Sequence, residues 1–138
     1  MGAIVPYLNF DGNCREAMKF YNECLGGDLA LTTFGEVDAK TAPESRDRLM
    51  HARITKDSKV LLMASDTMTG MPYVRGTNFW LSLGCDTDQE VDKLYGLLAA
   101  GGKESMAPHD AFWNARFAMF TDKYGINWML NHERMQPA

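Results

Sequence analysis

The chain has 138 residues, of which 46% are hydrophobic and 23% are charged. This size and composition are typical of one globular domain that buries a core without disulfides or structural metals. The net charge of −4 argues against a general nucleic-acid or membrane-surface binder. No apolar run is long enough to span a membrane, and the N-terminus lacks a signal-peptide pattern, so we expect a cytoplasmic protein.

The first half of the chain predicts a strand, a helix and three further strands. The helix follows Asn13, which can cap it together with Glu16, and it ends at Gly26 and Gly27, where glycine accepts the left-handed conformation. Its apolar face recurs at helical spacing and consists of Ala17, Phe20, Tyr21, Cys24 and Leu25. The expected strands are residues 4–10, 29–34, 49–56 and 59–65. Between the second and third strands, residues 35–48 are polar and predict a loop with a short helical turn.

The second half of the chain predicts the same order of elements. Thr87 or Asp88 caps its helix, whose apolar side consists of Val91, Leu94, Tyr95, Leu97 and Leu98. The expected strands are residues 77–83, 103–106, 113–121 and 126–131. A loop with Pro108, His109 and Asp110 is expected after residue 106. The polar tail, residues 133–138, is expected to fray.

The two halves read as a duplication. Tyr21 and Tyr95 stand 74 residues apart in the two helices, and the same shift lays residues 4–10 over 78–84. Gly70, Pro72 and Gly76 indicate a linker at residues 68–76, between a first module at 1–67 and a second at 77–133. Duplicated halves within one domain commonly build a shared cleft, where a ligand is expected.

The three cysteines, Cys14, Cys24 and Cys85, form no CxxC pair and no zinc-ligand spacing. We expect reduced, partly buried thiols without a catalytic role.

Several stretches of the sequence carry a family resemblance. They are Pro6-Tyr7-Leu8-Asn9-Phe10-Asp11-Gly12-Asn13-Cys14, Glu16-Ala17-Met18-Lys19-Phe20-Tyr21, Leu25-Gly26-Gly27, His51-Ala52, Leu62-Met63-Ala64-Ser65-Asp66, Phe112-Trp113 and Thr121-Asp122-Lys123-Tyr124-Gly125-Ile126-Asn127-Trp128-Met129. In their order and spacing the chain resembles the PhnB-like branch of the vicinal oxygen chelate superfamily, which includes glyoxalase I, extradiol dioxygenases, fosfomycin-resistance proteins and bleomycin-binding proteins. The resemblance implies an α+β fold of two tandem βαβββ modules, whose curved mixed sheet surrounds a cleft. It also implies a homodimer.

In the metal-using relatives, His, Glu or Gln ligands come from the first, fourth, fifth and eighth strands. Here the first strand offers Pro6, Tyr7, Leu8 and Asn9, and the fourth offers only residues 60–65. The fifth begins with Asn78, Phe79 and Trp80, and the eighth carries Met129 where Glu is expected, so none offers an imidazole or a carboxylate. Such side chains are poor ligands for the divalent ions of this superfamily, so we expect no metal and no cofactor. The alternative is a divalent-metal-dependent lyase, isomerase or dioxygenase, with His51 as its first candidate ligand.

The remaining polar residues that could bind a ligand are the three histidines and Arg53. His51 and Arg53 stand two apart on one strand and therefore share a face, where they could hold an anionic group. Alternatively Arg53 is only solvent-facing and His51 is hydrogen-bonded beneath a loop. His109 is expected on a surface loop, and His132 with Glu133 at a solvated strand end.

Aromatic residues gather on the expected strands: Tyr7, Phe79, Trp80, Phe112, Trp113, Phe117 and Trp128. They either pack in the core or line the cleft with Met63, Met119 and Met129, which would give an adaptable apolar pocket. The candidate ligand-binding residues are Tyr7, Asn9, His51, Arg53, Trp80, Ser82, Trp113, Met129 and Asn131.

The sequence therefore predicts a PhnB-like protein of unassigned activity that binds a small organic molecule without the superfamily metal. No Gly-rich nucleotide-binding turn supports a methyltransferase. A vestigial cleft in a protein that acts within a complex is the third alternative.

Overall fold

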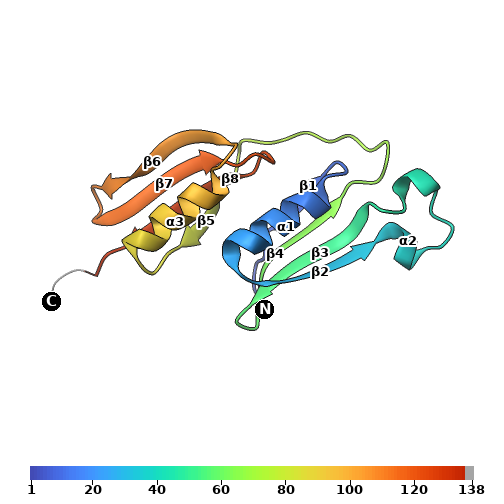
Figure 1. Cartoon of the computed structure of the whole chain (residues 1–138), viewed down its shortest axis with the longest axis horizontal. Coiled ribbons are helices and arrows are strands. Elements are labelled where there is room, and N and C mark those ends of the chain that lie inside the picture. The colour runs from blue at the N-terminus through green and yellow to red at the C-terminus, as the bar shows by residue number, and fades with distance from the viewer. Residues whose placement is uncertain (136–138) are drawn as a thin grey trace. The chain divides into compact units, whose positions relative to one another are not determined.

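The computed structural model of the protein describes residues 1–135 and divides into two compact units, a first module at Met1–Val74 and a second at Arg75–Ala138 (Figure 1). Of the tail that was expected to fray, residues 136–138 lie outside the described part. No helix within residues 1–135 has the length and apolar character needed to cross a bilayer.

The first module is a four-stranded sheet with one long helix on it. Its elements are β1 (Tyr7–Phe10), α1 (Cys14–Leu25), β2 (Asp28–Thr33), α2 (Phe34–Val37), the 3-10 turn η1 (Pro43–Ser45), β3 (Leu49–Lys56) and β4 (Lys59–Asp66). The strand order is β1-β4-β3-β2, in which β1 runs parallel to β4 and the other neighbours are antiparallel.

The second module repeats this plan. Its elements are β5 (Leu81–Gly84), α3 (Asp88–Leu98), β6 (Lys103–Ala111), β7 (Ala115–Thr121) and β8 (Asn127–Glu133). The order β5-β8-β7-β6, with β5 parallel to β8, matches the first sheet strand for strand. The predicted α+β fold of two βαβββ modules is confirmed, with one mixed sheet in each module.

The shift of 74 residues is borne out at the start of each module. β1 begins at Tyr7 and β5 at Leu81, while α1 begins at Cys14 and α3 at Asp88. The later strands depart from this shift because α2 and η1 occupy the connection between β2 and β3, whereas a short turn at residues 112–114 joins β6 to β7.

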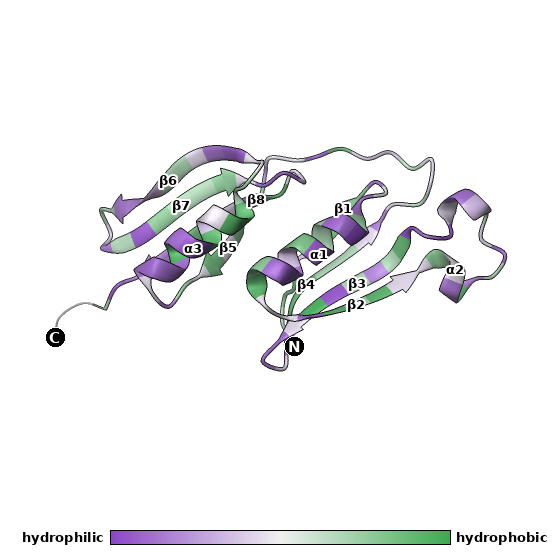
Figure 2. Cartoon of the chain, in the orientation of Figure 1, coloured by the Kyte–Doolittle hydropathy of each residue, from purple (hydrophilic) through white to green (hydrophobic). Residues whose placement is uncertain are grey.

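α1 and α3 each cover one face of their own sheet (Figure 1), and each buries apolar residues against it. Figure 2 shows polar and apolar residues mixed along both helices, as expected of amphipathic helices on a sheet. The buried residues of α1 are Cys14, Ala17, Met18, Tyr21 and Leu25. Ala17, Tyr21 and Leu25 of the predicted apolar face are therefore buried as expected. Phe20 is only half-buried, and Met18 is buried instead.

The predicted helix ends were partly right. Gly26 ends α1 in the left-handed conformation, with φ 71°, and Thr87 caps α3 by accepting the Glu90 N–H at 3.0 Å. Asn13 makes no capping bond. The buried carboxylate of Asp66 instead accepts the N–H groups of Gly12 and Cys14, so the start of α1 is capped from β4.

Three predicted elements of the second module differ from the structure. β5 begins only at Leu81, so residues 77–80 are not strand, and β7 begins at Ala115. The loop expected around Pro108 was wrong, because β6 continues through it to Ala111. β6 lies at the edge of its sheet, where proline is tolerated because its missing N–H can face solvent.

Candidate functional site

The face of each sheet opposite its helix carries most of the predicted ligand-binding residues. In the first module, strand alternation buries Leu8 and Phe10 and leaves Tyr7 and Asn9 exposed. These two residues lie on what we call the first open face, which is the side of the first sheet that α1 does not cover.

The first open face carries His51 and Arg53, which were predicted to share a face, and brings Tyr7 beside them. Tyr7 Oη and His51 Nδ1 lie 3.2 Å apart, and Arg53 pairs in register with Met63, which pairs with Tyr7. Arg53 is exposed and forms no ion pair with any residue of 1–135. His51 is hydrogen-bonded to Tyr7 and not to a loop. The polar groups of this face are therefore the Tyr7–His51 pair and, beside it, the Arg53 guanidinium, which has no ion-pair partner among residues 1–135.

The second open face, on the sheet of the second module away from α3, carries Ser82, Met129 and Asn131. Met129 and Asn131 alternate along β8 with the buried Trp128 and Leu130, and Ser82 pairs in register with Met129. Trp113, in the turn after β6, donates its ring N–H to the Asn131 side-chain oxygen at 3.3 Å. Trp80 precedes β5, so strand alternation does not place it with the others.

A cavity of about 470 Å³ lies on the second open face, because Phe117 and Met119 of its lining pair in register with Asn131 and Met129. Its lining consists of Met106, His109, Asp110, Ala111, Phe112, Trp113, Phe117 and Met119. The rings of Phe112 and Trp113 meet edge to face, with centroids 4.9 Å apart. The rings of Trp113 and Phe117 meet in the same way, with centroids 5.2 Å apart. Aromatic and methionine side chains give an apolar wall that can adapt to a ligand.

Sequence reasoning named Phe112, Trp113, Phe117 and Met119 of this lining as possible cleft residues, and it missed Met106, His109, Asp110 and Ala111. His109 was assigned to a surface loop, but on β6 it pairs in register with Phe117, and their ring centroids lie 6.0 Å apart. Because an edge strand tolerates proline, Pro108 did not exclude a strand here, and a strand through Pro108 would have placed His109 correctly.

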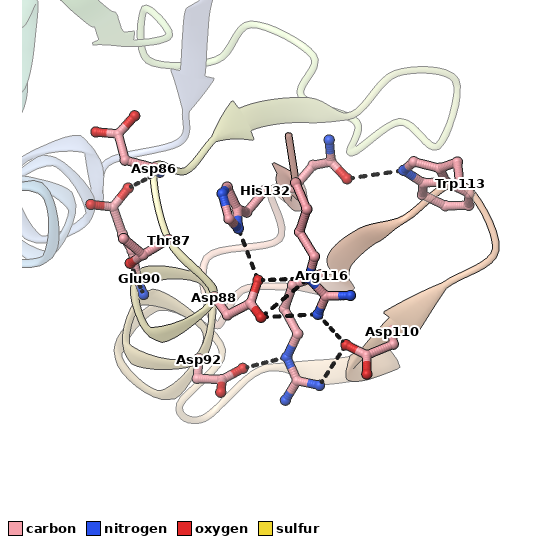
Figure 3. Close-up of polar contacts among 11 residues, drawn as sticks. Asp86, Thr87, Asp88, Glu90, Asp92, Asp110, Trp113, Arg116 and His132 are labelled. Atoms are coloured by element: carbon pink, nitrogen blue, oxygen red, sulfur yellow. Dashed lines mark hydrogen bonds and ion pairs between the residues drawn. The ribbon is translucent and has the colours of Figure 1, made fainter. Parts of the chain in front are cut away.

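A cluster of charged residues lies at the start of α3, where it meets the sheet (Figure 3). Asp88 accepts hydrogen bonds from His132 at 2.8 Å and from Arg134 at 2.9 Å. Arg134 also binds Asp110, and Arg116 joins Asp110 to Asp92. His132 is therefore half-buried in an ion-pair network, and the expectation of a solvated strand end was wrong for it.

The carboxylates of this cluster are neutralised by their partners. The hydrogen bonds from Arg134 and then His132 lower the pKa of Asp88, and Arg134 lowers the pKa of Asp110. The guanidinium pKa of Arg134 rises in turn, through Asp88 first and Asp110 second. Because each carboxylate already has a cationic partner, the cluster ties α3 to β6, β7 and β8 and is not a cation site.

The residues of this chain do not fit the divalent metal of the fold family. The side chains on the open faces at the strands concerned are Tyr7, Met63, Ser82 and Met129, which are weak donors for hard or borderline ions. Within residues 1–135, no three His, Cys, Asp or Glu side chains are grouped so that they could hold an ion.

Comparison with known proteins agrees with this architecture. The glyoxalase/bleomycin resistance protein/dioxygenase superfamily pattern matches residues 3–130. The chain is 32% identical to protein YjdN of Escherichia coli K12, over 96% of this chain and 97% of YjdN. The crystal structure of protein PA1353 from Pseudomonas aeruginosa is 42% identical, with a TM-score of 0.87, and the match covers 98% of this chain and 100% of PA1353. A PhnB protein from Bacillus cereus, at 24% identity and a TM-score of 0.78 over 95% and 99% of the two chains, shares the fold. The chain belongs to the glyoxalase/bleomycin resistance protein/dioxygenase superfamily.

Proposed function

We propose that this protein binds a small organic molecule on the second open face, without the superfamily metal. The observation that carries the proposal is the cavity of about 470 Å³ lined by aromatic and methionine side chains. Ligand sites in proteins commonly have this size and a mainly apolar wall with a few polar groups.

The polar groups at this cavity suit an uncharged, partly aromatic ligand. The Phe112, Trp113 and Phe117 rings offer faces and edges for aromatic contact. The Asn131 oxygen accepts the Trp113 N–H, which leaves the Asn131 amide nitrogen to donate to a ligand carbonyl. Asp110 contributes little charge, because Arg134 and Arg116 hold it.

The first open face supports the recognition of an anionic group. Arg53 is exposed, and a guanidinium without an intramolecular partner can form a bidentate pair with a carboxylate or phosphate. The Tyr7 hydroxyl and the His51 ring stand on the same face and can add hydrogen bonds.

We further propose a homodimer in the cytoplasm. Cys14, Cys24 and Cys85 form no disulfide within residues 1–135, and free thiols are usual in a reducing compartment.

The test is a titration with N-phenyl-1-naphthylamine, an uncharged aromatic probe whose fluorescence rises in apolar sites. Phe117→Ala removes a ring from the cavity wall and should weaken probe binding by about tenfold, since burial of a Phe side chain stabilises by about 1.5–3 kcal/mol. Phe79→Ala is the matched control, because Phe79 is exposed and does not line the cavity. Equal affinities in the two variants would place the ligand elsewhere.

Native mass spectrometry of protein purified without chelator tests the remaining parts of the proposal. We expect the mass of a dimer with no divalent ion. A monomer would contradict the dimer. One divalent ion per chain that is lost in His51→Ala would contradict metal-free binding and would favour the metal-dependent lyase, isomerase or dioxygenase.

A further inference from the structure

A second cavity lies in the first module, and its lining includes none of Tyr7, Asn9, His51 and Arg53. It has a volume of about 370 Å³ and lies at the segment from α2 to β3 and the residues after β4. Its apolar wall consists of Phe34, Val37, Met50 and Met68. Val37 and Met68 are 57% and 62% exposed, so these side chains lie at an accessible surface.

Hydrogen bonds hold the segment around this cavity in place. Thr33 and Glu36 form a reciprocal capping box at the start of α2, with bonds of 3.1 and 3.2 Å. The Phe34 N–H donates to the Arg48 carbonyl at 3.0 Å. The hydroxyls of Ser45 and Thr69 lie 2.5 Å apart and join η1 to the residues after β4. The segment from α2 to β3 and the residues after β4, which together bound the cavity, are therefore joined by hydrogen bonds.

The charge at the cavity is negative. Asp38 lines it and has no basic partner among residues 1–135. Within the described residues its Oδ1 accepts only the Lys40 N–H, at 2.9 Å. The cation of the lining, Arg48, is already occupied by the Asp11 carboxylate at 2.9 Å and by the Thr67 carbonyl.

We infer that this cavity binds a small amine with an apolar body. The ammonium group would pair with Asp38, while the alkyl or aryl part lies against Met50, Met68 and Phe34. This chemistry follows from charge complementarity, because an unpaired carboxylate at the rim of an apolar cavity favours a cationic head over a neutral or anionic one. Thr41 and Ser45 also line the cavity, and their hydroxyls can accept a further ammonium N–H.

The inference is tested with three probes that share a six-carbon chain: hexylamine, hexan-1-ol and hexanoate. Methionine methyl groups labelled with ¹³C report binding by NMR, because Met50 and Met68 line this cavity while Met106 and Met119 line the other one. Hexylamine should shift the Met50 and Met68 signals and bind about threefold or more tightly than hexan-1-ol, the size expected for one exposed ion pair. Hexanoate should bind weakest.

Two variants decide the role of the carboxylate. Asp38→Asn keeps the acceptor for the Lys40 N–H but removes the charge, so it should equalise hexylamine and hexan-1-ol. Asp28→Asn, on the first strand residue of β2 and outside the cavity, makes the same change in net charge and should keep the preference. A thermal unfolding scan confirms that both variants are folded.

Three results would overturn the inference. They are equal affinity of the amine and the alcohol in the unaltered protein, a preference that survives Asp38→Asn, and shifts confined to Met106 and Met119. A lack of any shift at Met50 and Met68 with all three probes would exclude the cavity as a binding site at the concentrations used.

Discussion

The Tyr7 hydroxyl lies 3.2 Å from His51 Nδ1, and this contact bridges β1 and β3 across the strand between them, β4. The two residues are 44 positions apart in the chain, and their ring centroids are 5.8 Å apart. The pair orients the imidazole on the first open face, beside Arg53.

Removing the Tyr7 hydroxyl should free the His51 ring without unfolding the protein. The bond is exposed, so Tyr7→Phe should change the free energy of unfolding by about 1 kcal/mol or less. The ¹⁵N resonance of His51 Nδ1 should nevertheless move, because its hydrogen-bond partner is lost. Tyr73→Phe, elsewhere in the first module, should leave that resonance in place. An unchanged Nδ1 signal in Tyr7→Phe would show that the contact is not formed in solution.

Asp66 is expected to be the most sensitive polar residue of the first module. Its buried carboxylate accepts N–H groups from Gly12 at 2.8 Å, Cys14 at 3.0 Å and Leu49 at 2.8 Å. Asp66→Ala would leave these donors without their acceptor and should cost about 3 kcal/mol or more in urea unfolding. Asp11→Asn, which removes the charge of the exposed Asp11 carboxylate that binds Arg48 and the Thr67 hydroxyl, should cost less than about 1 kcal/mol. Equal losses would mean that the buried bonds contribute no more than the surface pair.

The ion pairs of Asp88 should make the second module sensitive to acid. Arg134 and then His132 lower the pKa of Asp88 from its ordinary value of 3.8. A carboxyl group with a depressed pKa stabilises the fold above its unfolded pKa, and that contribution is lost as the pH falls through the folded pKa. Asp88→Asn should therefore be less stable than the unaltered protein near neutral pH, and the gap should shrink below about pH 4.

Urea unfolding at a series of pH values measures this gap. Asp28→Asn, which is exposed on β2 and belongs to no ion pair within residues 1–135, is the control and should show no such trend. A gap for Asp88→Asn that stays constant down to strongly acidic pH would contradict the role assigned to its charge.

Two glycines of the second module should respond to alanine in opposite directions. A Cβ at Gly102 would lie 2.2 Å from the Thr121 carbonyl oxygen on β7, so Gly102→Ala must displace backbone and should destabilise strongly. A Cβ at Gly96, inside α3, meets nothing within 4 Å, so Gly96→Ala should stabilise by about 0.5–1 kcal/mol through helix propensity. Thermal unfolding distinguishes the two, and similar melting temperatures would argue against the close approach at Gly102.

Buried thiols should be unreactive in the native protein. Burial, followed by the Asp66 charge, raises the pKa of Cys14 to about 12, and burial followed by Glu90 raises the pKa of Cys85 to about 12. Because the thiolate is the reactive form, a disulfide reagent at neutral pH should modify both only after denaturation. Cys24 is half-buried and should react first. Rapid modification of Cys14 in the folded protein would contradict its burial.

The amino-acid sequence by itself determined the duplicated plan of this protein. The apolar spacing around Tyr21 and Tyr95, the glycine pair after α1 and the alternation along β3 and β4 are local patterns, and each is set by residues close together in the chain. The same alternation placed His51 and Arg53 on one face before any contact between strands was known.

Only the tertiary structure decided what depends on distant segments. β6 runs through Pro108 because it lies at a sheet edge, and this position brings His109 to Phe117 and into the cavity wall. Asp66 replaces Asn13 as the cap of α1 because β4 carries its carboxylate to the helix start. His132 is paired because β8 ends against α3. Local propensity cannot predict these contacts, since each one requires two segments that meet only when the sheet and helix have packed together.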